Sequence, residues 1–241
     1  MVDLIQDIYP ELRTNLEAVS GRSLPAIFKA DGGAGMFFLD TGANCKSERA
    51  SGGSGTTNPD ELKELVQIAR ILVAEGTDEA DVTVLCMYRA QQVLARSLLD
   101  KKGLSRARVE TIDRYQGDEN EVVLVSLTRS GAQTKFTSTQ NRRCVAASRA
   151  RNLLVMLGDA TALRGVVTWR PLVQAFEKRH LCGPALPLEC PRHAGARLAA
   201  PDYACRHQCG RRHQSCGHAC RRPCHYECPP CEIRVDDVFE A

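Results

Sequence analysis

Val82-Thr-Val-Leu-Cys-Met87, Val122-Val-Leu-Val-Ser-Leu127 and Leu153-Leu-Val-Met-Leu157 are short, nearly continuous apolar runs. Runs of this length are typical of strands that are buried on both faces of a sheet. Amphipathic stretches of helical length lie between them, at about 89–99 and 142–151. Short apolar strands that alternate with such helices predict an α/β fold, with a parallel sheet and helices on both of its faces.

A clear helix start precedes these strands. Asn58 can cap the helix, Pro59 takes the first helical position, and Glu61 predicts a capping box. Gly76 supplies the expected stop. The remaining elements expected are strands over 36–39 and 108–112, a flexible loop over 47–57, and a last core helix over 169–180.

The composition of the 241 residues, 43% hydrophobic and 25% charged, is that of an ordinary globular chain. It excludes collagen, a coiled coil and wholesale disorder. No run approaches the roughly 18 apolar residues that a membrane-spanning helix needs. The first residues lack the basic and apolar regions of a secretion signal. We therefore expect a cytoplasmic or nuclear protein that is not secreted and binds no membrane.

Cysteine is concentrated near the carboxyl end. Of the 12 cysteines, nine lie between Cys182 and Cys231, interleaved with histidines at short spacings. A reducing compartment disfavours disulfides, and the mixture of cysteine with histidine fits metal ligation better. The break in composition predicts a globular domain over 1–180 and a small Cys/His tail, stabilised by zinc, over 181–241.

The tail offers more soft ligands than the four that a structural zinc ion takes in a tetrahedral site. Spacing along the chain allows one set of Cys190, His193, Cys205 and Cys209 and another of Cys216, His218, Cys220 and Cys224. Cys228 and Cys231 would then complete a further site or belong to a repeat that is cut short. The pairing stays open. The ten predicted ligands are Cys190, His193, Cys205, Cys209, Cys216, His218, Cys220, Cys224, Cys228 and Cys231. Arginines of the same region suit either RNA phosphates or a solvated surface.

Three polar segments are expected at the carboxyl ends of strands, where parallel sheets bind ligands. Thr111-Ile-Asp-Arg-Tyr-Gln-Gly-Asp-Glu-Asn-Glu-Val-Val-Leu-Val-Ser-Leu-Thr-Arg-Ser130 resembles motif V of superfamily 1 helicases. Asn141-Arg-Arg-Cys-Val-Ala-Ala-Ser-Arg-Ala-Arg151 resembles motif VI, and Leu85-Cys-Met-Tyr-Arg-Ala-Gln91 resembles motif IV. Together they resemble the second RecA-like domain of an RNA helicase, over residues 4–162.

The tail adds a second resemblance. Its Cys-Gly-His-x-Cys-x3-Cys-His stretch, which begins at Cys216, is similar to the zinc finger of the X-box-binding nuclear factor (NFX) type. A helicase body followed at once by such a finger resembles one family, the zinc-finger-containing superfamily 1 RNA helicases. The resemblance implies RNA as a partner, together with RNA-silencing or surveillance proteins.

The helicase resemblance also implies residue roles. Arg149 matches the catalytic arginine that contacts the γ-phosphate, a task that suits a guanidinium because it stays charged. Glu119 matches the glutamate that accepts from the ribose hydroxyls, and Gly117 would let the backbone approach the nucleotide. The expected nucleotide contacts are Gln116, Gly117, Glu119, Tyr88 and Gln91, and the expected nucleic-acid contacts are Thr111, Ser126 and Arg129.

The sequence departs from the family at the phosphate site. It contains no Gly-x-x-x-x-Gly-Lys-Ser/Thr loop, and no Walker B acidic pair that would hold magnesium lies ahead of the globular body. ATP and magnesium are therefore expected only with the missing amino-terminal half, and the chain alone is expected to hydrolyse no ATP. Two other functions stay open: an RNA-binding scaffold with a vestigial helicase fold, and a zinc-dependent protein-interaction module.

Overall fold

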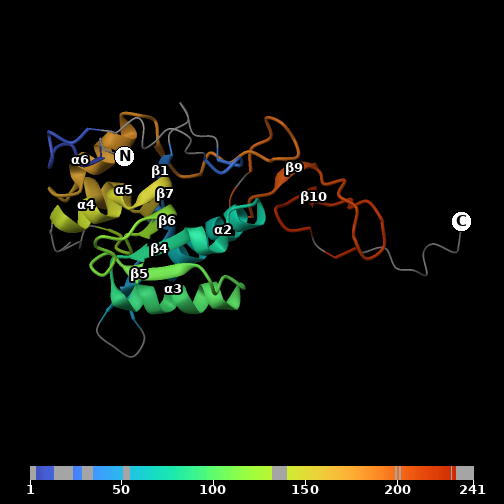
Figure 1. Cartoon of the computed structure of the whole chain (residues 1–241), viewed down its shortest axis with the longest axis horizontal. Coiled ribbons are helices and arrows are strands. Elements are labelled where there is room, and N and C mark those ends of the chain that lie inside the picture. Colours follow the sequence, from blue (N-terminus) through green and yellow to red (C-terminus); the bar gives the residue numbers. More distant parts are fainter. Residues whose placement is uncertain are drawn as a thin grey trace, which may run out of the picture. The chain divides into compact units, whose positions relative to one another are not determined.

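Figure 1 shows the computed structural model of the chain, which describes residues 4–13, 24–28, 35–50, 55–131, 140–198, 200, 202–228 and 230–231. The chain divides into two compact units, Met1–Leu186 and Pro187–Ala241. We call these the first unit and the second unit. The sheet lies in the first unit, and the ten predicted metal ligands lie in the second.

The first unit is built on a six-stranded sheet in the order β5-β4-β6-β7-β1-β8. All five strand pairs are parallel. Its strands are β1 (Met36–Asp40), β4 (Val82–Cys86), β5 (Arg108–Thr111), β6 (Asn120–Ser126), β7 (Ala150–Gly158) and β8 (Cys182–Gly183). Every residue of β4 is buried, as the apolar run predicts for a strand inside a covered sheet. β8 pairs with β1, so the sheet unit continues past residue 180.

Helices flank the sheet (Figure 1), which confirms the predicted α/β fold with helices on both faces. They are α2 (Pro59–Ala74), α3 (Arg89–Lys101), α4 (Gln140–Ser148), α5 (Ala160–Arg164) and α6 (Arg170–Glu177), with short 3-10 turns η3 (Gly42–Asn44) and η4 (Glu79–Asp81). Trp169 and Phe176 are buried, and the Phe176 ring meets that of Phe38 edge-on with centroids 5.8 Å apart. The core role predicted for this last helix is confirmed. No helix among the described residues is long and apolar enough to cross a bilayer.

The capping box predicted at the start of α2 is only half correct. The Oδ1 atom of Asn58 accepts from the Glu61 amide at 3.1 Å, as expected of a cap. The Glu61 carboxylate does not return to Asn58. It is fully buried and accepts from Ser126 Oγ at 2.5 Å and from the Thr128 amide at 2.9 Å. The Asn58 amide donates instead to Gln91 Oε1 at 2.8 Å, so a tertiary network replaces the local one.

Two short antiparallel pairs lie outside the main sheet. In the first unit, β2 (Glu48–Arg49) pairs with β3 (Thr56–Thr57), so the flexible loop predicted over 47–57 is wrong at its ends. Residues 51–54 of that loop lie outside the described residues. In the second unit, β9 (Cys205–Gln208) pairs with β10 (Pro223–Cys224) in a hairpin.

Candidate functional site

The strand register places the helicase-like segments at two opposite edges of the sheet. Tyr88 follows the carboxyl end of β4, and Thr111 ends β5. Glu119 and Arg149 instead precede β6 and β7 at their amino ends, where the Asn120 amide donates to the Arg149 carbonyl at 3.1 Å. The prediction that all three segments meet at the carboxyl edge is wrong. In a parallel sheet the chain must return from the carboxyl end of one strand to the amino end of the next. It has made this return before it reaches Glu119.

The amino edge carries a cavity of about 940 Å³ in which Gln116, Glu119 and Arg149 come together. One part of its wall comes from residues 5–12, and another comes from α4. The remaining lining residues are Ile5, Ile8, Tyr9, Pro10, Glu11, Leu12, Asn141, Cys144, Val145 and Ser148. The wall thus combines apolar groups and an aromatic ring with carboxylates and a guanidinium, so it could receive a ligand with a ring, hydroxyls and an anionic group.

Arg149 carries the positive charge of this cavity. Its Nε and Nη2 atoms donate to the hydroxyl of Ser148 at 3.2 and 2.9 Å, and that hydroxyl donates to the Cys144 carbonyl at 2.7 Å. Within the described parts of the chain, no carboxylate forms an ion pair with Arg149. The guanidinium is therefore oriented by neutral groups and keeps its charge for an incoming anion, for which its planar donor set suits phosphate.

Glu119 and Gly117 differ in how they serve the site. The exposed Glu119 carboxylate accepts from Arg151 Nε at 3.2 Å through one oxygen, and Arg151 also reaches Glu121 at 3.4 Å. Gly117 does not line the cavity, and a Cβ added there would meet nothing within 4 Å. Its φ of +97° favours glycine at this turn, and its close approach to the nucleotide stays a prediction.

The Arg143–Asp7 ion pair is a feature of the site that the sequence analysis missed. Arg143 of α4 is buried, and its Nη2 atom donates to Asp7 Oδ2 at 2.7 Å. The pair ties α4 to the segment that supplies Tyr9 to the cavity wall. The two residues are 136 positions apart. No local pattern could have joined them.

The carboxyl edge holds a separate polar group around Tyr88. Arg129 Nε donates to the Tyr88 hydroxyl at 2.8 Å, and its Cζ atom lies 5.3 Å from the centre of the Tyr88 ring. Thr111 is half-buried at the same edge. Tyr88 does not line the amino-edge cavity, so the structure does not bring it together with Glu119 and Arg149.

The structure also bears on two other predicted contacts, Gln91 to the nucleotide and Ser126 to the nucleic acid. Both are fully buried, and the Gln91 amide nitrogen donates to Ser126 Oγ at 2.8 Å and to the Asn58 carbonyl at 3.2 Å. Neither side chain is available to a nucleotide or a nucleic acid, because both are bonded inside the fold. They support the buried Glu61, and burial raises the pKa of that carboxyl to about 7 against the opposing hydrogen bonds from Ser126 and Thr128.

The ten predicted metal ligands gather in three groups, in each of which the ligand atoms lie within 4.8 Å of one another. We call them the first, second and third Cys/His groups. They consist of Cys190, His193, Cys205 and Cys224, then Cys209, Cys220 and Cys228, then Cys216, His218 and Cys231. These are not the sets that spacing along the chain suggests. Cys224 joins the first group, and Cys209 and Cys220 meet in the second.

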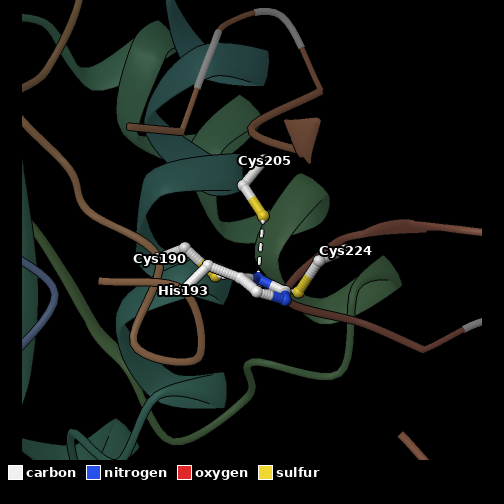
Figure 2. Close-up of side chains that lie close together, drawn as sticks. All are labelled: Cys190, His193, Cys205 and Cys224. Carbon is white, nitrogen blue, oxygen red and sulfur yellow. Dashed lines mark hydrogen bonds between the residues drawn. The ribbon is translucent and has the colours of Figure 1, made fainter. Parts of the chain in front are cut away.

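The first Cys/His group has the donor set and dimensions of a closed zinc site. Cys190 and Cys224 hold their sulfurs 3.7 Å apart, and the His193 Nδ1 atom lies 3.4 Å from Cys190 Sγ and 3.2 Å from Cys205 Sγ. Figure 2 shows the four side chains converging. Zinc–sulfur bonds of about 2.3 Å in a tetrahedron separate two sulfurs by about 3.8 Å. The residues therefore fit a tetrahedral zinc ion with three thiolates and one imidazole.

The hairpin explains why the groups interleave. Cys205 on one arm is paired in register with Cys224 on the other. Nearer the turn, the Cys209 amide donates to the Arg222 carbonyl, and the Gly210 amide donates to the Cys220 carbonyl. Two ligands at similar distances from the turn are thus brought together across the arms. Spacing along the chain misses this, because it compares only residues on the same arm.

The parallel sheet of the first unit matches a known protein family. A family model described as "AAA domain" matches residues 8–161, which include β1 to β7 and the cavity residues from Ile8 onward. The chain belongs to this family. The expected resemblance to superfamily 1 helicases with zinc fingers is confirmed by both this match and the relatives.

The relatives are proteins much longer than this chain. "NFX1-type zinc finger-containing protein 1" of Mus musculus is 29% identical over 201 residues, which are 79% of this chain and 10% of that protein. "Helicase required for RNAi-mediated heterochromatin assembly 1" of Schizosaccharomyces pombe is 34% identical over 163 residues, 65% of this chain and 16% of that protein. "DNA replication ATP-dependent helicase/nuclease DNA2" of Mus musculus is 29% identical over 157 residues, which are 64% of this chain and 14% of that protein. The chain thus spans between a tenth and a sixth of these relatives.

Proposed function

We propose that this chain is the carboxy-terminal part of an ATP-dependent RNA helicase. It would contribute one face of the ATP cleft, an RNA-binding surface and a zinc-stabilised finger region. The observation that carries the proposal is the single amino-edge cavity that joins Gln116, Glu119 and Arg149. Gln116 and Glu119 belong to the segment that resembles motif V, and Arg149 belongs to the segment that resembles motif VI.

The proposed roles follow from the chemistry of each side chain. Arg149 would donate to the γ-phosphate, where its charge offsets the negative charge that develops during phosphoryl transfer. Glu119 would accept from the ribose hydroxyls through the oxygen that Arg151 does not hold. Glu11 and Glu119 are the carboxylates among the described residues of the cavity wall. Magnesium and the phosphate loop would come from the other half of the motor.

RNA would bind at the carboxyl edge, in our proposal. There Arg129 and Thr111 can contact phosphates, and the Tyr88 ring can stack on a base. One relative is named for RNAi and another for DNA replication, so the choice of RNA rests on the RNAi-linked helicase and on the motif resemblance. A cytoplasmic or nuclear location, with RNA-silencing or surveillance proteins as partners, belongs to the same proposal.

The second unit would bind zinc for structural reasons. A unit with so few apolar residues and so many soft ligands gains much of its folding free energy from the metal. Zinc supplies tetrahedral cross-links between the two hairpin arms when it is bound. The fit of the first Cys/His group to zinc supports this part of the proposal.

Binding measurements on the 241-residue chain test the nucleotide half-site. We expect weak, saturable ATP binding that falls at least about tenfold in Arg149→Ala, the loss of one charge-assisted contact. Arg106→Ala is the matched control, since Arg106 also precedes a strand at the amino edge but pairs with Asp78 outside the cavity. Equal affinities for ATP in both variants would contradict the proposal.

Single-stranded RNA and DNA of one sequence test the nucleic-acid surface. We expect RNA to bind more tightly, and Arg129→Ala to weaken RNA binding and reduce its salt dependence. Binding of RNA without any ATP binding would instead favour the alternative function, a catalytically inactive RNA-binding scaffold with a vestigial helicase fold.

A further inference from the structure

Two arginines of the second unit donate directly to ligand sulfurs. Arg192 Nε donates to Cys224 Sγ at 3.3 Å, and Arg211 Nε donates to Cys209 Sγ at 3.0 Å. Cys224 belongs to the first Cys/His group and Cys209 to the second. Each of these two groups therefore has one sulfur that is held by a guanidinium.

The same two guanidinium groups meet at one backbone carbonyl. Arg192 Nη2 donates to the His225 carbonyl at 3.3 Å, and Arg211 Nη2 donates to that same oxygen. Arg211 Nη1 also reaches the Tyr226 carbonyl at 3.2 Å. His225 directly follows Cys224 of the first group, and Cys228 of the second group comes three positions later. The shared carbonyl thus lies on the short segment that joins the two groups.

The chemistry of a thiolate-rich zinc site explains why a cation is needed there. Three thiolates and an imidazole around a divalent zinc ion leave one net negative charge. A charged N–H donor at a bound sulfur offsets that charge and fixes the direction of the sulfur. The arginine fork suits a sulfur and a carbonyl that lie side by side, because its neighbouring N–H donors are planar and rigid.

We propose that Arg192 and Arg211 are positioning residues for two metal centres, each holding one ligand sulfur and both joined through the His225 carbonyl. The inference rests on the proposal that the Cys/His groups bind zinc. It goes beyond that proposal, because it assigns to these two arginines a role at the ligand sulfurs that the other arginines of the region do not share. Arg206 and Arg221 each adjoin a ligand cysteine, are exposed, and donate to no ligand sulfur within the described residues.

Cobalt(II) reconstitution of the full chain tests the inference by a spectroscopic signature. Loss of an N–H donor raises the energy of the sulfur electrons, so the sulfur-to-cobalt charge-transfer band should move to longer wavelength. We expect this shift in Arg192→Gln and in Arg211→Gln, with about 10- to 100-fold weaker zinc binding in a chelator competition. Arg206→Gln and Arg221→Gln remove the same charge beside a ligand and should leave the band and the affinity unchanged.

The outcomes separate the two proposals. If the wild-type chain takes up neither cobalt nor zinc, both the zinc proposal and this inference fail. If it takes up metal and all four variants share its band and affinity, zinc stands and the positioning role is overturned.

Lysine variants keep the test decisive if a glutamine variant does not fold. Arg192→Lys and Arg211→Lys retain one charged donor that can reach the sulfur, but not the carbonyl as well. We expect a band near the wild-type position together with faster zinc release. Release of zinc at the wild-type rate would contradict the role assigned to the shared carbonyl.

Discussion

The Sγ atom of Cys190 lies 3.7 Å from the Sγ atom of Cys224, although the two residues are 34 positions apart. Between them in the sequence lie Cys209 and Cys220, which belong to a different group. The ligands of the two groups therefore interleave along the sequence. Because these contacts are long-range, the proposed zinc binding would be coupled to folding of the second unit.

Serine substitutions test the ligand groups. Cys190→Ser and Cys224→Ser should each abolish the first site, so each variant should lose one zinc per chain, and the double variant should lose no more. Elemental analysis of the purified chain measures this. Cys182→Ser is the control, because Cys182 lies in β8 and in none of the three groups. A double variant that loses two zinc ions would contradict the grouping.

Zinc chelation should unfold the second unit and leave the sheet of the first unit intact. The first unit is stabilised by buried apolar strands and helices, whereas the second unit depends on its ligands. Hydrogen exchange read by mass spectrometry should show rapid exchange in residues 190–231 and unchanged protection in β4, β6 and β7. One cooperative melting of the whole chain on addition of chelator would disprove this.

The buried Glu61 predicts a dependence of stability on pH. Its pKa of about 7 in the folded state lies above the ordinary glutamate value of 4.5, so the folded chain binds more protons between these two values. The free energy of unfolding contributed by Glu61 should therefore fall as the pH rises through this window. The shift corresponds to about 3 kcal/mol at most.

Denaturant unfolding at pH 5 and pH 8 checks this prediction. Glu61→Gln keeps an acceptor but does not titrate, so its stability relative to wild type should increase with pH. Asp60→Asn, which changes an exposed carboxyl in the same helical turn, should show no such trend. A constant difference between wild type and Glu61→Gln would show that the carboxyl is ionised throughout.

Asn58→Ala should cost about 3 kcal/mol of unfolding free energy, more than an ordinary helix cap. The side chain caps α2 and also donates to the Cys45 carbonyl at 3.3 Å and to the Thr128 carbonyl at 3.0 Å. Asp78→Ala removes an exposed cap from η4 and should cost less than about 1 kcal/mol. Similar losses in the two variants would mean that the buried bonds of Asn58 contribute little.

Local patterns in the sequence predict the elements of this fold well, and long-range pairing limits the rest. The apolar runs predict β4, β6 and β7 because a strand buried on both faces needs such a run. The partner of Glu61 is not predictable in this way, since Ser126 lies 65 positions away and replaces the local bond to Asn58. Likewise, the motif resemblance predicts that Glu119 and Arg149 act in one site. It does not predict that Tyr88 lies at the opposite ends of the strands, which follows only from the strand register.

The measurement that tests the central claim most directly follows the arginine side chains of the full chain by nitrogen-15 NMR during titration with ATP and, separately, AMP. The account predicts that the Nε–H signal of Arg149 shifts saturably with ATP and much less with AMP, which lacks the γ-phosphate. The Arg106 signal should stay in place. Shifts caused by ATP at other arginines, with Arg149 unmoved, would contradict the assignment of this cavity to a nucleotide.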